Sequence, residues 1–331
     1  MTLALAHSRG WLDYDARVVR YWPEFGANAK ETITVRQLLA HEAGLAALDA
    51  RVDLATLRDP DRLAAALAEQ RPLWEPGTAT GYHTYTIGFY EGEILRRVDP
   101  QHRTLGRFFR EEIAQPLGLE FYIGLPSSVP GERLAPVAFF HPAGLLVDPF
   151  SMPWAFYGAM GDPRSLAGRS FASPNLGEVF PDYLGPAARG LEVPAVLGIG
   201  EARAMAKAYS CFAISCPELG LRGETLAALR PPARNARDGT LDLVLQVPVS
   251  FSLGFDKPNP AFRFGSDAAF GTPGAGGSFA YADPERGVGY AYTPNRLGYF
   301  AYDDPRDLAL RSALERSLRR LSACWSLAPA Q

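Results

Sequence analysis

The sequence predicts an α+β fold, with a mostly helical lobe at about residues 1–235 and an antiparallel sheet with a terminal helix at about 236–331. Apolar residues recur at helical spacing in several segments of the first part. The last third instead alternates apolar and polar residues, as strands with one buried face do. Two strand-like segments, 277–282 and 287–293, flank a turn with Pro284 and Gly287, which indicates a hairpin. Because helices and strands are segregated, we expect one α+β domain over residues 1–331 and no parallel sheet.

Individual helices are predicted from apolar spacing and from their end signals. Thr34 and Gln37 form a capping box, and Asp59 with Pro60 supplies an N-cap and a first helical residue. The last helix has an apolar stripe that we expect to face the sheet, at Leu310, Leu314, Leu318 and Leu321. The predicted helices cover residues 2–9, 34–44, 59–70, 86–97, 104–114, 200–212 and 307–321. Further strands are expected over 241–249 and 250–255.

Composition excludes several classes of protein. A hydrophobic content of 47% with 21% charged residues over 331 residues is ample for a buried core. The net charge of −3 gives no electrostatic basis for binding nucleic acid or an anionic membrane. The sequence has no apolar run of roughly eighteen residues and no signal-peptide layout at its start, so we expect a cytoplasmic protein without a membrane span.

Metal, cofactor and disulfide signals are weak. The five histidines are scattered, and no second histidine follows His41-Glu42 at zinc-site spacing, so no metal and no cofactor are predicted. There is no Gly-x-Ser-x-Gly motif. The three cysteines, Cys211, Cys216 and Cys324, are too few for a disulfide framework and are expected to be buried free thiols.

Two irregular segments are candidates for function. In residues 73–88, Pro76-Gly77 and Gly81 place Tyr82 on a loop directly before a helix, which suits a structural tyrosine at a helix start or a catalytic phenol. Taken alone, the structural role is favoured. In residues 270–278, clustered glycines leave N–H groups free, which is consistent with an oxyanion hole or with a glycine-rich bulge at a sheet edge.

Four segments in order resemble the β-lactamase-related serine hydrolases, a superfamily that includes class C β-lactamases, penicillin-binding peptidases and family VIII carboxylesterases. The segments are 33–45, the Pro76-Gly77-Thr78 and Tyr82-His83-Thr84 pair, 108–119 and 271–278. The resemblance implies a β-lactamase/penicillin-binding-like fold, in which an antiparallel sheet is flanked by helices. It also implies acyl-enzyme chemistry on a small-molecule ester or amide, most simply as a carboxylesterase.

The resemblance assigns roles to particular residues. Tyr82 would transfer protons as general base and acid, which requires nearby cations because a free phenol has a pKa near 10. Thr84 would replace the asparagine that contacts substrate, with His83 beside it. The resemblance places Thr272, Pro273 and Gly274 in the substrate-binding strand triad, and the Ala275 N–H in the oxyanion hole.

The sequence also departs from the family pattern. Thr84 has no amide, and Thr272 has no cationic side chain. The sequence also has no Ser-x-x-Lys, because the residue three positions before each of its three lysines (residues 27, 204 and 254) is not serine. We expect the nucleophile helix and the first strands to precede Met1, and therefore an inactive chain. The alternative is a catalytically dead homologue that binds a ligand or a partner. Aromatic residues over 139–157 suggest an apolar substrate pocket.

Overall fold

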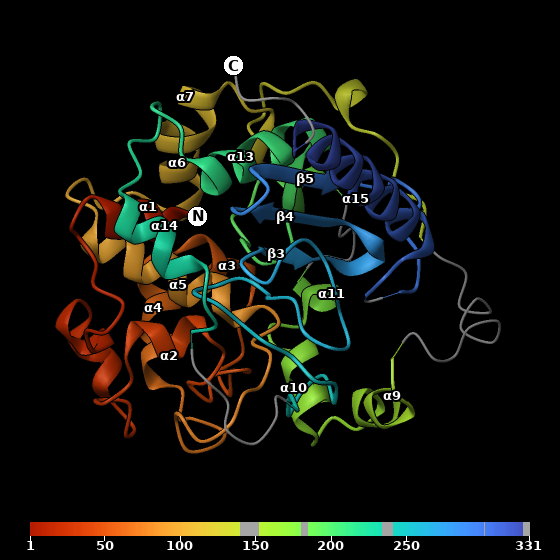
Figure 1. The fold of residues 1–331 in the computed structure, drawn as a ribbon. Helices are drawn as coiled ribbons and strands as arrows, with labels where there is room; N and C mark the ends of the chain where they lie inside the picture. The colour runs from red at the N-terminus through yellow and green to blue at the C-terminus, as the bar shows by residue number, and fades with distance from the viewer. Residues whose placement is uncertain (140–151, 180–184, 234–240, 301, 327–331) are drawn as a thin grey trace.

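The computed structural model describes residues 1–139, 152–179, 185–233, 241–300 and 302–326. The helices of residues 1–117 cluster on one side, and the main sheet with helices α13 (Ala202–Ile214) and α15 (Pro305–Ser326) lies on the other (Figure 1). The described helices of at least four residues, with their bounds, are α1 Thr2–Ser8, a 3₁₀ helix Pro23–Gly26, α2 Val35–Leu39, α3 Leu54–Arg58, α4 Pro60–Glu69, α5 Thr86–Val98, α6 Leu105–Phe109, a π-helical turn Arg110–Ala114, α9 Trp154–Gly161, α10 Leu166–Phe171, α11 Leu176–Val179, α12 Pro186–Arg189, α13 Ala202–Ile214, α14 Gly223–Leu229 and α15 Pro305–Ser326. No helix in these described ranges is both long and apolar enough to cross a bilayer.

The main sheet has three antiparallel strands in the order β3 (Phe270–Pro273), β4 (Phe279–Asp283) and β5 (Val288–Tyr292). Tyr281 of β4 lies opposite Gly271 and Tyr290, which sets the register across the sheet. The predicted β4–β5 hairpin is confirmed. A second sheet pairs the short strands β1 (Phe121–Ile123) and β2 (Gly198–Gly200).

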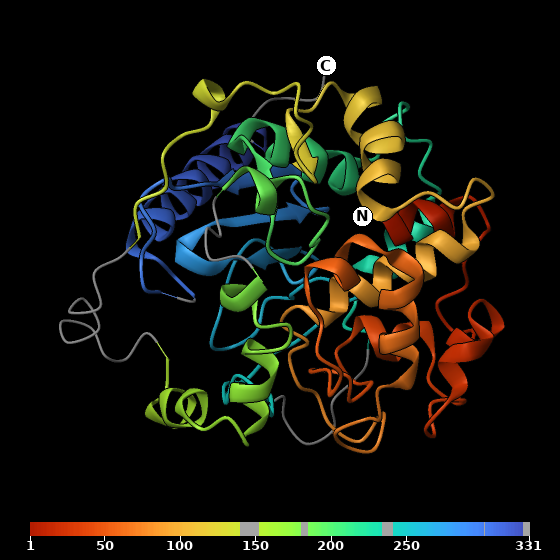
Figure 2. The same cartoon turned by 180° about the vertical axis from the view of Figure 1, so that it is seen from behind.

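Helix α13 packs tightly on strand β5, and Figure 2 shows the same two elements together from behind. The close approach depends on Gly289, where a Cβ atom would lie 2.3 Å from the backbone oxygen of Ala206 and from the backbone nitrogen of Ser210. A side chain at this position would therefore push the helix off the sheet.

The N-terminal signals of the predicted helices act as expected. The Thr34 side chain accepts from the Gln37 N–H at 3.2 Å while the Gln37 side chain accepts from the Thr34 N–H at 2.9 Å, so α2 has a complete capping box. Asp59 caps α4, whose first residue is Pro60. These short helices begin where local side-chain chemistry places them.

The strands predicted over 241–249 and 250–255 are wrong. Asp242 accepts the backbone N–H groups of Val244 and Leu245, both at 2.8 Å, and so folds this segment into a turn. Only isolated bridges, such as that between Phe251 and Asp256, remain in this described stretch. An aspartate side chain that accepts backbone N–H groups two and three residues further on stabilises a turn in place of a strand. The alternation of apolar residues did not reveal this.

The packing predicted for the C-terminal helix is also wrong. Leu310 and Leu321 are 52% and 57% exposed, and the buried residues of α15 include Asp307 and Arg311. The Arg311 guanidinium bonds Asp307 at 2.6 Å and lies over the ring of Phe279, with 5.1 Å to the centroid. The helix is thus anchored on the sheet by this cation–π contact and by the Tyr290 hydroxyl of β5, which donates to Asp307 at 2.8 Å.

Cys211 and Cys216 form a disulfide, so the free-thiol interpretation is wrong for these two residues. The left-handed backbone at Ser215 (φ 64°) turns the chain at the end of α13 and brings the two Cα atoms to 5.0 Å, within the ordinary disulfide range. Because disulfides are uncommon in reducing compartments, the cytoplasmic location stays a prediction.

Candidate functional site

Tyr82 lies in the loop before α5 and packs among aromatic side chains. Its ring centroid is 5.1 Å from that of His41 and 6.4 Å from that of Phe251. Met152 and Phe156 belong to the same apolar cluster, so part of the aromatic segment expected to shape a substrate pocket does reach Tyr82. Phe139 and Trp154 are exposed instead, and residues 140–151 of that prediction lie outside the described residues.

Two side chains that are distant in sequence fix the backbone of Tyr82. Asp242 accepts the Tyr82 N–H at 3.1 Å, with the same oxygen that accepts the two N–H groups of its own turn. Ser170 donates its hydroxyl to the Tyr82 carbonyl at 3.0 Å. Asp242 Oδ2 is buried and has no hydrogen-bond partner among the described residues. The loop conformation of Tyr82 therefore depends on α10 and on the 241–249 turn.

Thr84 is buried next to Tyr82 and supports this arrangement. Its Oγ1 lies 2.8 Å from the Oγ of Ser170. Since Ser170 uses its only proton on the Tyr82 carbonyl, the Thr84 hydroxyl is the donor in this pair. This placement favours a positioning role for Thr84, through Ser170, over direct contact with a substrate.

His83 is fully buried, and both of its ring nitrogens are used inside the protein. Its Nε2 accepts the Leu45 N–H at 2.9 Å, so the proton is on Nδ1, which donates to His41 Nδ1 at 3.2 Å. His41 Nδ1 also accepts the His83 backbone N–H at 3.1 Å, so both rings are neutral. Burial lowers the pKa of His83 to about 3, and burial together with His83 lowers the pKa of His41 well below its usual range. These contacts favour a structural role for His83 over the substrate contact suggested by the sequence.

Strand β3 presents Thr272 and Pro273 next to the turn of Gly274 and Ala275. Thr272 and Ala275 are exposed. The turn to β4 is closed by hydrogen bonds from Gly274 N–H to the Ser278 carbonyl and from Gly277 N–H to the Gly274 carbonyl. Within the described residues, nothing accepts a hydrogen bond from the Ala275 N–H. This amide is therefore available to an external acceptor.

The tight connection between β3 and β4 explains why the 270–278 segment is rich in glycine. Gly277 has φ 95°, which favours glycine, and a Cβ there would lie 2.3 Å from Asp304 Oδ2. The segment is the tight connection between β3 and β4. The bulge considered from the sequence is thus replaced by a short 3₁₀ turn, Ala275–Gly277.

Asp256 connects Tyr82 to strand β3. Its backbone pairs with Gly271 through two hydrogen bonds of 2.7 and 2.9 Å, directly before Thr272. Its carboxyl group is close enough to Tyr82 to contribute to the raised pKa of that phenol. Burial raises the pKa of Tyr209 of α13 and Thr272 lowers it in part, so this phenol lies next to Thr272. The structure thus brings Tyr82 and the strand that carries Thr272, 190 positions apart in the sequence, to one residue, Asp256.

The electrostatics of this group differ from the expectation for a general base. Burial, then Asp256 and Asp242, raise the pKa of Tyr82 above its ordinary value, so the cation-lowered pKa expected for a base is absent from this structure. Burial raises the pKa of Asp256 to about 8 and that of Asp242 to about 6. At neutral pH the Tyr82 hydroxyl is therefore a hydrogen-bond donor.

A model of the Beta-lactamase family matches residues 1–315. The chain belongs to the Beta-lactamase family. The β-lactamase/penicillin-binding-like fold predicted from the sequence is confirmed by solved structures that cover nearly the whole chain.

Relatives in this family are esterases as well as β-lactamases. The chain is 32% identical over 314 residues to the "Esterase/beta-lactamase LipL" of Mycobacterium tuberculosis, a match that covers 90% of this chain and 67% of that protein. It is similar to EstA from Arthrobacter nitroguajacolicus, with 32% identity, a TM-score of 0.81 and coverage of 96% and 81%. It is also similar to a family VIII carboxylesterase, with 33% identity, a TM-score of 0.77 and coverage of 95% and 79%. The chain is thus an esterase-like member of the β-lactamase-fold serine hydrolases.

The lysines of this Beta-lactamase family member are engaged away from Tyr82. Lys30 Nζ donates to three carbonyls, among them those of Ala68 and Gln70 at 2.7 and 2.6 Å. Lys257 Nζ donates to the Ala269 carbonyl at 2.5 Å, and Lys207 Nζ to that of Leu117 at 2.5 Å. None of these three lysines is therefore placed to lower the pKa of Tyr82.

Sequence reasoning missed Ser170, Asp242 and Asp256. Each lies in a segment without a recognisable motif, and each reaches Tyr82 or β3 only through tertiary contacts. The one available signal was Asp242 directly before the alternating segment, where an aspartate suits a turn better than a strand.

Proposed function

We propose that the group formed by Tyr82, Thr272 and Ala275 is the ester-binding site of a β-lactamase-fold carboxylesterase. The observation that carries the proposal is the meeting of Tyr82 and β3 at Asp256. A substrate carbonyl oxygen would accept the free Ala275 N–H, and the Tyr82 hydroxyl would donate to the ester or its leaving oxygen. Thr272 and Pro273 would line the substrate along β3, with Gly274 turning the chain toward Ala275.

Acyl transfer in this family type needs a nucleophilic serine activated by a lysine. The printed sequence has no Ser-x-x-Lys, and its lysines bond to backbone carbonyls elsewhere. The protonated Tyr82 suits donation better than proton abstraction. We therefore propose that these 331 residues bind an ester without forming an acyl-enzyme. This proposal is compatible with the alternative, a catalytically dead homologue that binds a ligand.

The test measures binding and chemistry separately on the 331-residue chain. Hydrolysis of 4-nitrophenyl butyrate, hydrolysis of nitrocefin and labelling by a fluorophosphonate probe report the covalent step. Calorimetric titration with butyramide, which an esterase does not readily cleave, reports binding at the carbonyl site. We expect no labelling and saturable binding that Tyr82→Phe weakens about three- to tenfold, the value of one lost hydrogen bond.

Tyr85→Phe is the matched control, because Tyr85 is the next tyrosine along the same loop. Covalent labelling of a serine in the 331-residue chain would overturn the absence of an acyl-enzyme. Butyramide binding that is absent, or equally weakened by both substitutions, would overturn the ester site at Tyr82.

A further inference from the structure

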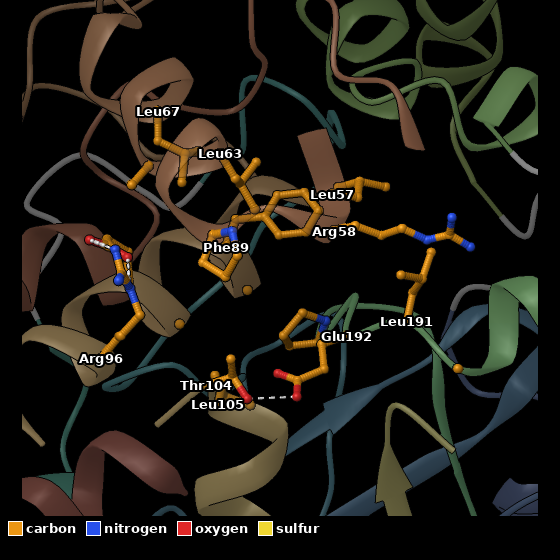
Figure 3. Close-up of a pocket in the computed structure, with 17 residues that line it drawn as sticks. Leu57, Arg58, Leu63, Leu67, Phe89, Arg96, Thr104, Leu105, Leu191 and Glu192 are labelled. Atoms are coloured by element: carbon orange, nitrogen blue, oxygen red, sulfur yellow. Dashed lines mark hydrogen bonds and ion pairs between the residues drawn. The ribbon is translucent and has the colours of Figure 1, made fainter. Parts of the chain in front are cut away.

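A cavity of about 260 Å³ lies in the helical lobe between α4, α5 and the segment 190–194 (Figure 3). None of its lining residues belongs to the Tyr82 group described above. Its lining on α5 begins at Gly88, six positions after Tyr82, and continues to Arg96. Neither the sequence motifs nor the proposed ester site assigns it a purpose.

The walls of the cavity are mostly apolar. Leu67, Phe89 and Leu105 are buried, and Leu63 and Leu191 are half-buried. Figure 3 shows these aliphatic and aromatic side chains directed toward a common space. Such a lining gains free energy by removing an alkyl chain from water.

The charged residues inside the cavity are satisfied within the protein. Arg96 bonds Glu93 at 2.8 Å and Asp61 at 2.8 Å. Glu192 accepts the Thr104 hydroxyl at 2.7 Å, drawn in Figure 3, and the Gly106 N–H at 2.9 Å. These groups leave little capacity for a ligand's polar atoms.

Arg58 differs from them. It ends α3 at the rim of the cavity, is exposed, and makes no ion pair or hydrogen bond to any described residue. Figure 3 shows its side chain extended from Leu57 toward the side of the cavity where Leu191 lies. A guanidinium in this position presents a planar pair of donors that matches a carboxylate.

We propose that this cavity binds an aliphatic monocarboxylate of medium chain length, with the alkyl chain between α4 and α5 and the carboxylate on Arg58. The apolar walls require the chain, and the unpaired rim cation selects an anionic head. A dicarboxylate is disfavoured because its second charge would be buried against leucines and near Glu93 and Glu192. The inference does not depend on the proposed ester site.

Sodium octanoate is the probe, titrated calorimetrically into the full chain, with hexanoate and butanoate as shorter acids and octanol as the neutral analogue. Affinity should rise about fourfold for each added CH₂ that the cavity buries. Arg58→Gln should weaken octanoate binding about two- to fivefold, as expected for an exposed ion pair, and leave octanol binding unchanged.

Two further variants separate charge from shape. Arg62→Gln removes an exposed arginine of α4 that does not line the cavity, and should leave octanoate binding unchanged. Gly92→Leu should fill the space, because a Cβ at Gly92 meets only the Leu105 Cβ, at an ordinary 3.7 Å. It should weaken octanoate and octanol alike by about tenfold or more, since several CH₂ groups lose their place.

Circular dichroism and thermal melting of Gly92→Leu establish that the variant is folded before its binding is interpreted. The absence of saturable octanoate binding to the unmodified chain would overturn the proposal. Equal losses in Arg58→Gln and Arg62→Gln, or unchanged binding in folded Gly92→Leu, would overturn it as well. Because butyramide binding and Tyr82→Phe report the ester site separately, failure at one site is distinguishable from failure at the other.

Discussion

The carboxylate of Asp242 accepts the backbone N–H of Tyr82 at 3.1 Å, across 160 positions of sequence. The same oxygen closes the turn at Val244 and Leu245. A single acceptor thereby links the loop before α5 to the segment that leads toward β3. The orientation of Tyr82 is a consequence of this contact as much as of its own loop.

Removing the whole Asp242 side chain should therefore destabilise the protein more than neutralising its charge. Asp242→Ala leaves three N–H donors without their acceptor and should lower the free energy of unfolding by about 2–4 kcal/mol. Asp242→Asn keeps an acceptor oxygen and should cost about 1 kcal/mol or less. Urea denaturation at pH 7 measures both, and equal losses in the two variants would contradict the role of the Oδ1 acceptor.

The neutral pair of His41 and His83 should make stability depend on pH. The unfolded chain protonates His83 near pH 6.5, but the folded chain resists this until about pH 3, so the stability it contributes is present above 6.5 and lost as pH falls. His83→Gln keeps an acceptor for the Leu45 N–H without titrating. The stability advantage of the unmodified chain over His83→Gln should shrink by about 1.4 kcal/mol per pH unit between pH 6.5 and 5.

Thermal or urea denaturation across this range measures the difference, with His102→Gln, which removes an exposed imidazole, as the matched control. A difference between unmodified chain and His83→Gln that stays constant from pH 7 to pH 5 would contradict the assignment of a neutral, buried pair.

Asp256 should show the opposite dependence. Its pKa is raised to about 8 by burial and by Asp242, so its contribution to stability is complete below about pH 3.8 and is lost as pH rises through 8. Asp256→Asn resembles the protonated acid at every pH. The free energy of unfolding of the variant, relative to that of the unmodified chain, should rise by about 1.4 kcal/mol per pH unit between pH 5 and 7.

Asp267→Asn is the control for the loss of an exposed carboxylate nearby. Denaturation midpoints at pH 5, 6 and 7 give the slopes. A slope for Asp256→Asn no larger than that for Asp267→Asn would show that the Asp256 carboxylate is already ionised in the folded protein.

The attachment of α15 should depend on charge rather than on its leucines. Arg311→Ala leaves Asp307 buried without its cation and should lower the free energy of unfolding by about 3–5 kcal/mol. Leu310→Ala removes an exposed side chain and should cost less than about 0.5 kcal/mol. Urea denaturation monitored by circular dichroism compares them, and the reverse ranking would restore the leucine stripe as the packing face.

Part of the fold was predictable because it depends on local sequence. The capping box of Thr34 and Gln37, the Asp59 cap and the hairpin between β4 and β5 depend on residues only a few positions apart. The order of the motifs around Tyr82 and Thr272 also sufficed to predict the fold. Sequence spacing carried no information about partners such as Ser170 and Asp256, since these meet Tyr82 and β3 only after the chain folds.

The sequence alone determined the helix starts, the hairpin, the family and the absence of a Ser-x-x-Lys in these 331 residues. The tertiary structure decided which polar groups lose their water. Burial made His83 a neutral structural residue. Tertiary packing placed acidic side chains rather than cations around Tyr82, and it turned Arg311 of α15, rather than the leucines, toward the sheet. Protonation and pairing depend on desolvation and on neighbours from distant segments, and neither quantity exists until those segments pack together.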